Sequence, residues 1–319
     1  MLQAGLSMLW ESADPVVALR DRFGFEDVES VAAWMSRNLA GVWGITAGEC
    51  TRIVVSDQNA IAWVGSDGGD LVVKWSGDRE RFPALQGSTR LLPVLAGWGV
   101  PVASPVAAAG GLVRVEVDGP VGTLSVTVLP EIEGSWLDVE DRASVLSAGA
   151  HLAKLHQALG FVRHDRQSST GLKSRISTWL SHSDRGRAPA ASRILAALLS
   201  GIGDLVDTPQ LVHNDFRAAN ILTRNSEVCG ILDFDEVTVD HRVNDLAKAC
   251  TYLSTLFTDW RPTPPAVRQV FRAGYESVRP LGPSESQWLE ILMLWHAIAA
   301  IPVDDSFGWA SALGPVTST

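Results

Sequence analysis

The sequence predicts an α+β protein of two parts, a small antiparallel sheet followed by a larger and mainly helical region. Short apolar runs between glycine and aspartate turns occupy residues 42–129, a pattern typical of antiparallel strands. Apolar residues at helical spacing dominate from about residue 141 onward. Strands first and helices later indicate segregated parts. The segment 129–134 breaks the pattern, so we predict one part at 1–131 and another at 132–319.

Residues 1–40 are predicted to be a helical cap on the sheet, because apolar residues follow acidic helix starts at Asp14 and Asp27. A helix at 79–97 is predicted to end at glycines and a proline. The predicted strands are 42–47, 52–56, 60–64, 71–75, 112–117 and 123–129. The predicted helices of the second part are 141–159, 192–205, 266–278 and 284–301.

Charge and cysteine content exclude several classes of protein. A formal net charge of −10 argues against nucleic acid or an anionic membrane as the main partner. That charge is compatible with a cationic substrate, and solubility alone would explain it equally well. Three distant cysteines, no signal peptide and no apolar run of about 18 residues predict a cytoplasmic protein with no membrane partner. A homodimer is compatible with the sequence.

The most informative polar residues are Asp215, Asn220 and Asp233, which follow one another at short spacing. A carboxylate can accept the proton of an attacking hydroxyl, and amide and carboxylate oxygens are ligands that Mg²⁺ prefers. Phosphoryl transfer from a nucleotide needs this set. Taken singly, each residue could be a turn or helix-capping residue, but their combined spacing favours catalysis.

The segment 211–246 resembles the catalytic core of the aminoglycoside phosphotransferase family, which has choline kinase and homoserine kinase relatives. The matching runs are Leu211-Val212-His213-Asn214-Asp215, Asn220-Ile221-Leu222, Gly230-Ile231-Leu232-Asp233-Phe234-Asp235 and Asn244-Asp245-Leu246-Ala247. The resemblance implies a bilobal protein-kinase-like fold, with a nucleotide-binding lobe at 1–131 and a catalytic, acceptor-binding lobe at 132–319. It also implies Mg²⁺ as cofactor and ATP or GTP as co-substrate.

The resemblance assigns roles in the core. Asp215 would be the catalytic base, and Asn220 and Asp233 would hold the metal. His213 and Asp245 would brace the catalytic loop.

The roles of two further residues stay open. Arg217 would clamp the transferred phosphoryl group or form an ion pair with Asp235 or Asp240. Asp235 would touch a second metal or fix the loop by a hydrogen bond.

Lys74 is the strongest nucleotide-binding candidate, because it is the sole lysine of the first 150 residues and lies in an apolar strand. A buried ammonium needs an anion, which nucleotide phosphates would supply; an exposed strand face is the alternative. The related enzymes place a Glu partner on the following helix, where this chain has Ser88. Either Glu80 is the partner, which we prefer, or Lys74 is held without a salt bridge.

Further nucleotide contacts are predicted from position along the chain. Gly48 and Thr51 are predicted to lie in a phosphate-covering loop between the first two strands, where a plain hairpin is the alternative. The backbone of Leu129, Glu131 and Ile132 is predicted to face the purine edge.

The acceptor is predicted to be a small molecule, because only eleven residues separate Asp233 from Asp245. The predicted acceptor pocket combines residues 163–190 with the C-terminal helices. Its candidates, each also explicable as core or surface residues, are Trp179, Trp260, Trp288, Trp295, Trp309, Glu276, Glu290, Asp304 and Asp305.

Among small molecules we rank an antibiotic of aminoglycoside or nucleoside type first. A metabolite such as homoserine, choline or a sugar follows. A non-catalytic pseudokinase that binds nucleotide is the alternative from a different class.

Overall fold

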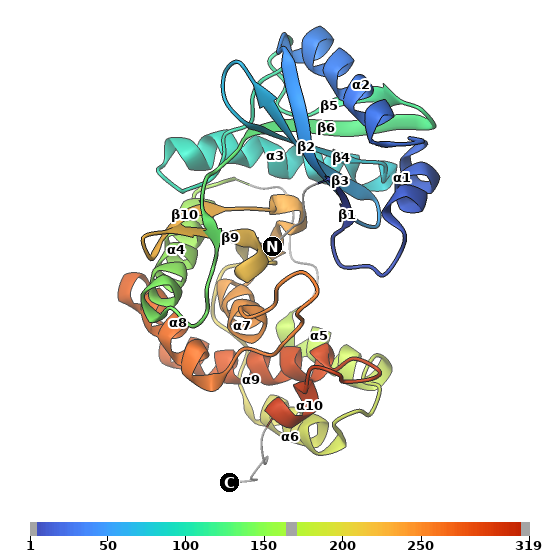
Figure 1. The fold of residues 1–319 in the computed structure, drawn as a ribbon. Coiled ribbons are helices and arrows are strands. Elements are labelled where there is room, and N and C mark those ends of the chain that lie inside the picture. The colour runs from blue at the N-terminus through green and yellow to red at the C-terminus, as the bar shows by residue number, and fades with distance from the viewer. Residues whose placement is uncertain (1–4, 164–170, 314–319) are drawn as a thin grey trace. The chain divides into compact units, whose positions relative to one another are not determined.

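The computed structural model describes residues 5–163 and 171–313 (Figure 1). The chain divides into two compact units, with the division between Glu133 and Gly134. The predicted boundary lies two residues earlier, between Glu131 and Ile132. The first unit contains a six-stranded sheet and the second contains most of the helices, so the predicted α+β class is confirmed.

The sheet of the first unit has the strand order β1-β2-β3-β4-β6-β5. Strand β1 pairs in parallel with β2, and the remaining neighbours are antiparallel. The strands are β1 (Gly5–Met8), β2 (Ala47–Val55), β3 (Asn59–Ser66), β4 (Leu71–Ser76), β5 (Val115–Gly119) and β6 (Gly122–Pro130). Four of the predicted strands lie within or beside β2, β3, β4 and β6, and the one predicted at 112–117 begins only at Val115.

The structure corrects two predictions about the N-terminal region. The strand predicted at 42–47 does not form: residues 42 and 43 end a π-helix, Leu39–Trp43, which is followed by Gly44 with a φ of 68°, and residue 47 begins β2. Glycine adopts this left-handed conformation without steric cost. The helical cap predicted at 1–40 contains strand β1, which gains its partner from β2 more than forty residues later. Local periodicity cannot detect such a long-range pairing.

Helices α1 (Pro15–Phe23) and α2 (Val28–Asn38) share an apolar core with one face of the sheet. Trp75 of β4 is at the centre of this core, and its ring contacts Phe23 and Trp34. Because side chains alternate along a strand, Lys74 projects from the opposite face. Helix α3 (Phe82–Gly97) follows a 3₁₀ turn, Arg79–Arg81.

The second unit is built mainly from helices, with two small antiparallel sheets (Figure 1). The helices are α4 (Arg142–Gly160), α5 (Leu172–His182), α6 (Pro189–Gly201), α7 (Arg242–Tyr252), α8 (Pro265–Val278), α9 (Pro283–Ala300) and α10 (Trp309–Ala312). The strands are β7 (Ser135–Trp136), β8 (Gln210–Val212), β9 (Ile221–Arg224), β10 (Glu227–Ile231) and β11 (Thr238–Asp240). The four predicted helices correspond to α4, α6, α8 and α9. None of the helices in the described ranges has both the length and the apolar character of a membrane span.

Helices α4 and α8 approach each other so closely that their backbones touch. A Cβ atom at Gly149 would lie 2.0 Å from the Phe271 carbonyl oxygen, and one at Gly274 would lie 2.1 Å from that of Leu146. Real Cβ atoms do not approach backbone this closely, so both positions require glycine. This contact positions Tyr275 of α8 beside His156 of α4, and both residues are fully buried.

Candidate active site

The loop that follows β8 carries the predicted catalytic residues. Strand β8 pairs with β11 and ends at Val212, and the next residues turn sharply because Asn214 has a φ of 67°. Asparagine is among the few residues that adopt this left-handed conformation readily. A short 3₁₀ turn, Ala218–Asn220, then leads into β9. The turn places Asn220 back against the start of the loop.

His213 is enclosed and hydrogen-bonded at both ring nitrogens. Its Nε2 lies 3.0 Å from the Leu232 carbonyl oxygen, and its Nδ1 accepts the Asp215 N–H at 3.3 Å. The rings of Phe216 and Phe234 pack edge-on against the imidazole. A carbonyl can only accept, so Nε2 carries the proton and the ring is held in one tautomer. These contacts fit a bracing role.

Asp215 is held by two side chains and is 30% exposed. The Arg217 Nε lies 3.0 and 3.2 Å from its two carboxylate oxygens, and the Asn220 amide donates to one of them at 2.7 Å. Burial raises the pKa of the Asp215 carboxyl, Arg217 counteracts this, and the charge of Asp233 raises the pKa further. The net rise makes this carboxylate a stronger base than an ordinary aspartate.

Arg217 forms its ion pair with Asp215, a partner that sequence reasoning did not consider. Of the two partners that were predicted, Asp240 is bound by both Arg175, at 2.8 Å, and Asn244. The Arg217 guanidinium lies over the Trp260 ring, 5.4 Å from its centroid. Its Nη1 is buried and makes no hydrogen bond to the part of the protein that the structure describes. One donor of Arg217 is therefore available for a ligand.

Asn220 and Asp233 have the oxygen donors that a magnesium site requires. The side-chain amide nitrogen of Asn220 donates to Asp215, so the side-chain Oδ1 of Asn220 points away from Asp215. The main-chain carbonyl oxygen of Asn220 accepts the Leu232 N–H at 2.8 Å. That bond brings Asp233, the next residue, to the same loop. Asp233 is exposed and has a φ of 59°. Within the described ranges no group of three His, Cys, Asp or Glu side chains could hold a metal. Asn220 and Asp233 offer one amide and one carboxylate oxygen donor, a pair that suits Mg²⁺.

Asp245, which lies in α7, anchors the catalytic loop, the segment 213–220 that carries the predicted catalytic residues. Its carboxylate accepts the backbone N–H groups of His213 at 3.1 Å and Asn214 at 2.8 Å, and the Nε2–H of His156 at 2.9 Å. Burial opposes ionisation, but the hydrogen bond from His156 and nearby cations such as Lys248 outweigh it, so the pKa of Asp245 is lowered. The loop is therefore fixed by a buried, ionised carboxylate.

A chain of buried hydrogen bonds continues from Asp245 through residues that sequence reasoning missed. The Tyr275 hydroxyl donates to His156 Nδ1 at 2.9 Å and accepts from Arg242 at 3.0 Å. Arg242 in turn bonds Glu285 at 2.7 Å. Burial lowers the pKa of His156 and raises that of Tyr275 to about 12, so both are neutral. A lone histidine on the apolar side of the helix at 141–159 was the available signal.

The nucleotide-binding candidates lie in the first unit. Lys74 of β4 is half-buried and pairs across the sheet with Ile61 and Thr127. Glu80 is exposed in the 3₁₀ turn after β4, and its N–H bonds the Asp78 side chain. Ser88 is buried on α3 and bonds the Leu85 carbonyl.

The loop predicted at Gly48 and Thr51 is wrong, because both residues lie inside β2. The register of β2 against β3 shifts between Ala47 and Cys50 and again before Arg52. These irregularities break the alternation of apolar residues, which made a continuous strand read as two strands and a loop. The turn that joins β2 to β3 is at residues 56–58.

The segment predicted to face a purine continues from β6. Leu129 pairs with Val72, and the Glu131 N–H donates to the Asp70 carbonyl at 2.9 Å. This N–H is therefore already used within the sheet. Burial and the charge of Asp70 raise the pKa of Glu131. Ile132 is half-buried.

The predicted acceptor residues separate into core and surface. Trp288 and Trp309 are buried in the core, whereas Trp260 is 36% exposed beside Arg217. The predicted acids have structural partners: Glu276 and Glu290 bond Arg272, and Asp305 accepts the first N–H groups of α10. Asp304 is exposed. Residues 164–170 of the predicted pocket lie outside the described residues.

The family model of the phosphotransferase enzyme family matches residues 52–286. This chain belongs to that family. The homoserine kinase of Beijerinckia indica is 29% identical over 175 residues, which are 50% of this chain and 51% of the relative. The homoserine kinase of Gluconobacter oxydans is 26% identical over 238 residues, 72% of this chain and 73% of the relative. The chain thus spans about half of one relative and about three quarters of the other.

Solved structures with a similar fold show the architecture. A microcompartment-associated aminopropanol kinase has a TM-score of 0.61 at 18% identity, covering 88% of this chain and 93% of that chain. An amicoumacin kinase, solved in complex with AMP-PNP, Ca²⁺ and Ami, has a TM-score of 0.56 at 16% identity, covering 88% of this chain and 90% of that chain. The predicted kinase-like fold is confirmed.

Proposed function

We propose that this protein is a small-molecule kinase that transfers the γ-phosphoryl group of ATP or GTP to a hydroxyl of its acceptor. The contact between Asp215 and Asn220, at 2.7 Å, carries the proposal. It joins a basic carboxylate to a metal-ligand candidate within one braced loop. The family membership supports the same reaction class.

Asp215 would accept the acceptor's hydroxyl proton, or orient that hydroxyl for in-line attack. Its raised pKa suits the first role. Arg217 would hold the carboxylate in position through Nε, and its unpaired Nη1 would donate to the phosphoryl oxygens. Lys74 would bind the α- and β-phosphates.

Asn220 and Asp233 would hold Mg²⁺, which supplies neutralisation of phosphate charge when it is bound. Asp235, near the same end of β10, would touch a second metal ion or fix the loop by a hydrogen bond. A cytoplasmic location and a homodimer stay predictions of the sequence.

A small hydroxylated metabolite is our first choice of acceptor. Three of the four acids expected to hold the amines of an antibiotic are bonded to Arg272 or cap α10, which disfavours a polycationic acceptor. The homoserine kinase relatives favour a hydroxy amino acid. An antibiotic acceptor is the second choice, because amicoumacin and spectinomycin kinases share the fold.

The test is a screen of hydroxy amino acids, amino alcohols, sugars and antibiotics with ATP or GTP and Mg²⁺, read by the mass of phosphorylated product. We expect one acceptor class to react with the wild type and not with Asp215→Asn. Nucleotide affinity of the variant should match that of the wild type. Nucleotide binding without turnover on the whole panel would instead identify a pseudokinase.

A further inference from the structure

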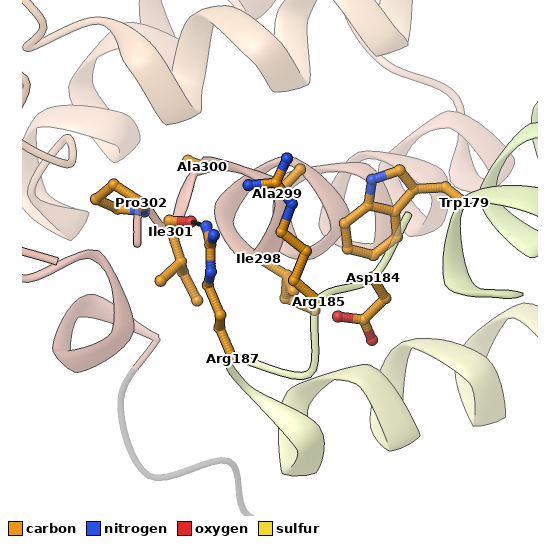
Figure 2. A pocket seen from close by; sticks show the side chains of 9 residues that line it. All are labelled: Trp179, Asp184, Arg185, Arg187, Ile298, Ala299, Ala300, Ile301 and Pro302. Carbon is orange, nitrogen blue, oxygen red and sulfur yellow. Dashed lines mark hydrogen bonds between the residues drawn. The ribbon is translucent and has the colours of Figure 1, made fainter. Parts of the chain in front are cut away.

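The second unit contains a cavity of about 310 Å³ that no part of the proposed reaction uses (Figure 2). Its walls come from Trp179 in α5, from the segment between α5 and α6, and from the C-terminal end of α9 with Pro302. It lies in the region predicted to bind the acceptor, but its charged groups are not the predicted ones.

Two arginines from one short segment reach into this cavity. In Figure 2 the guanidinium groups of Arg185 and Arg187 both point toward the end of α9. Arg187 donates to the Ile301 carbonyl, which fixes its direction. Arg185 makes no hydrogen bond or ion pair with any residue that the structure describes.

The one carboxylate of the cavity has a local role. Asp184 accepts the Gly186 N–H at 3.0 Å, which closes the turn that carries both arginines. Figure 2 shows the Arg185 guanidinium extending away from the Asp184 carboxylate, toward Ala299. The cavity therefore contains two guanidinium charges that this carboxylate does not pair.

A rigid aromatic and aliphatic surface faces the arginines. The Trp179 ring packs edge-on against Trp295 at 6.4 Å, and Trp295 stacks on His296 at 4.8 Å. Ile298, Ile301 and Pro302 complete the apolar side. A cavity with a few convergent polar groups and apolar walls is typical of a small-molecule site.

The chemistry of the arginines defines the ligand. Two like charges on one segment repel each other, and an anion bound between them would replace that repulsion by attraction. The planar guanidinium fork matches carboxylate and phosphate oxygens, with two parallel hydrogen bonds. Neutralisation of the C-terminal carbonyls of α9 explains Arg187 but does not explain Arg185.

We propose that this cavity binds the anionic group of a small organic molecule, a carboxylate or a phosphate monoester. Arg185 and Arg187 bind the anion, and Trp179 contacts the body of the molecule. The ligand is either the acceptor of the proposed kinase or a separate metabolite. The identity of the ligand as the acceptor rests on the proposed function, whereas its identity as a separate metabolite does not.

Calorimetric titration with phenyl phosphate tests the site, in the presence of saturating AMP-PNP and Mg²⁺ to fill the nucleotide site. We expect one equivalent of phenyl phosphate to bind, and to bind more tightly than inorganic phosphate because its ring meets Trp179. Arg185→Gln should weaken binding about tenfold or more, since it removes a charge-assisted hydrogen bond. Arg193→Gln is the matched control, because Arg193 is an exposed arginine of α6 outside the cavity.

Equal affinity in Arg185→Gln and wild type, or no binding of phenyl phosphate at millimolar concentration, would overturn the proposal. Circular dichroism and thermal melting of Arg185→Gln must match the wild type. A Trp179→Ala variant provides a second measure, because it should reduce phenyl phosphate binding while leaving inorganic phosphate unaffected.

The source of the ligand follows from kinetics once an acceptor is known. Competition between phenyl phosphate and acceptor, with a raised KM in Arg185→Gln, identifies the acceptor as the ligand. Binding without competition identifies a separate metabolite. Phenyl phosphate binding that survives in a protein without kinase activity supports the site and refutes only the proposed function.

Discussion

The catalytic loop and the first turns of α7 each contribute an aspartate to the same part of the second unit, yet the two carboxylates have opposite properties. Asp245 is buried and accepts three N–H groups, and its pKa is lowered. Asp215 is partly exposed, is bonded by Arg217 and Asn220, and has a raised pKa. A carboxylate with all its bonds inside the protein stabilises the fold, whereas one that meets solvent is available for chemistry.

The largest expected effect is the loss of activity in Asp215→Asn, which would distinguish the chemical role of Asp215 from the structural role of Asp245. Asp215→Asn should lower the rate of phosphoryl transfer by about 10²–10⁴-fold, because the proposed general base is lost. Single-turnover kinetics with the identified acceptor would measure this. Relative to wild type, the free energy of unfolding should change less in Asp215→Asn than in Asp245→Asn. An active Asp215→Asn enzyme would remove Asp215 from the mechanism.

Asp245→Asn should act first on stability. The amide keeps one acceptor oxygen but loses the charge that three donors share, so we expect a loss of about 3 kcal/mol in the free energy of unfolding. Urea denaturation followed by circular dichroism would measure it. Lost activity in a protein of unchanged stability would show instead that Asp245 takes part in the reaction.

The two tyrosines of the chain offer a matched pair. Tyr275→Phe removes the hydroxyl that bonds His156 Nδ1 and Arg242 Nη1, so it should cost about 1–3 kcal/mol and lower kcat. Tyr252→Phe removes one hydrogen bond to the His296 carbonyl and should cost about 0.5–1.5 kcal/mol with kcat unchanged. Burial raises both tyrosine pKa values to about 12, so their protonation states do not differ.

Equal kcat values for the two tyrosine variants would show that the chain of hydrogen bonds does not position the loop. Nucleotide affinity should be the same in both, because neither hydroxyl belongs to the first unit. The comparison therefore isolates the loop from nucleotide binding.

The smallest effect is the pH dependence of stability. The folded-state pKa of Asp245 is lowered, so its contribution to stability is complete above the ordinary value of 3.8 and is lost as the pH falls below it. The folded-state pKa of Asp215 is raised, so its contribution is complete below 3.8 and is lost as the pH rises through the folded value.

Unfolding measured from pH 7 to pH 3 for wild type and the two Asn variants would test these signs. The deficit of Asp245→Asn relative to wild type should narrow toward the acidic end. For Asp215→Asn, lowering the pH should raise the free energy of unfolding of the wild type relative to that of the variant. The same direction of change in both variants would contradict the opposite pKa shifts.

Sequence reasoning succeeded where short spacing carries the signal. Asp215 and Asn220 are five residues apart, and one 3₁₀ turn is enough to bring them into contact. The helices at 141–159 and 284–301 were predicted because their apolar residues recur regularly over several turns.

It failed where partners are distant in the chain. Strand β1 depends on β2, and His156 meets Asp245 across 89 residues. One of the two roles predicted for Arg217 was an ion pair with Asp235 or Asp240, and the ion pair that forms is with Asp215, two residues away. Charge alone does not predict with which of several nearby acids an arginine forms an ion pair, because the pairing depends on side-chain geometry.

The two glycines that join α4 to α8 make positions far from any substrate sensitive to substitution. One added methyl group at residue 149 would separate the helices, and the Tyr275–His156 bond would be the first to lengthen. In a genetic screen for inactive variants, alanine at 149 or 274 should therefore be recovered together with changes at the reaction centre. Such variants would be poorly folded as well as inactive, which distinguishes them from those at Asp215.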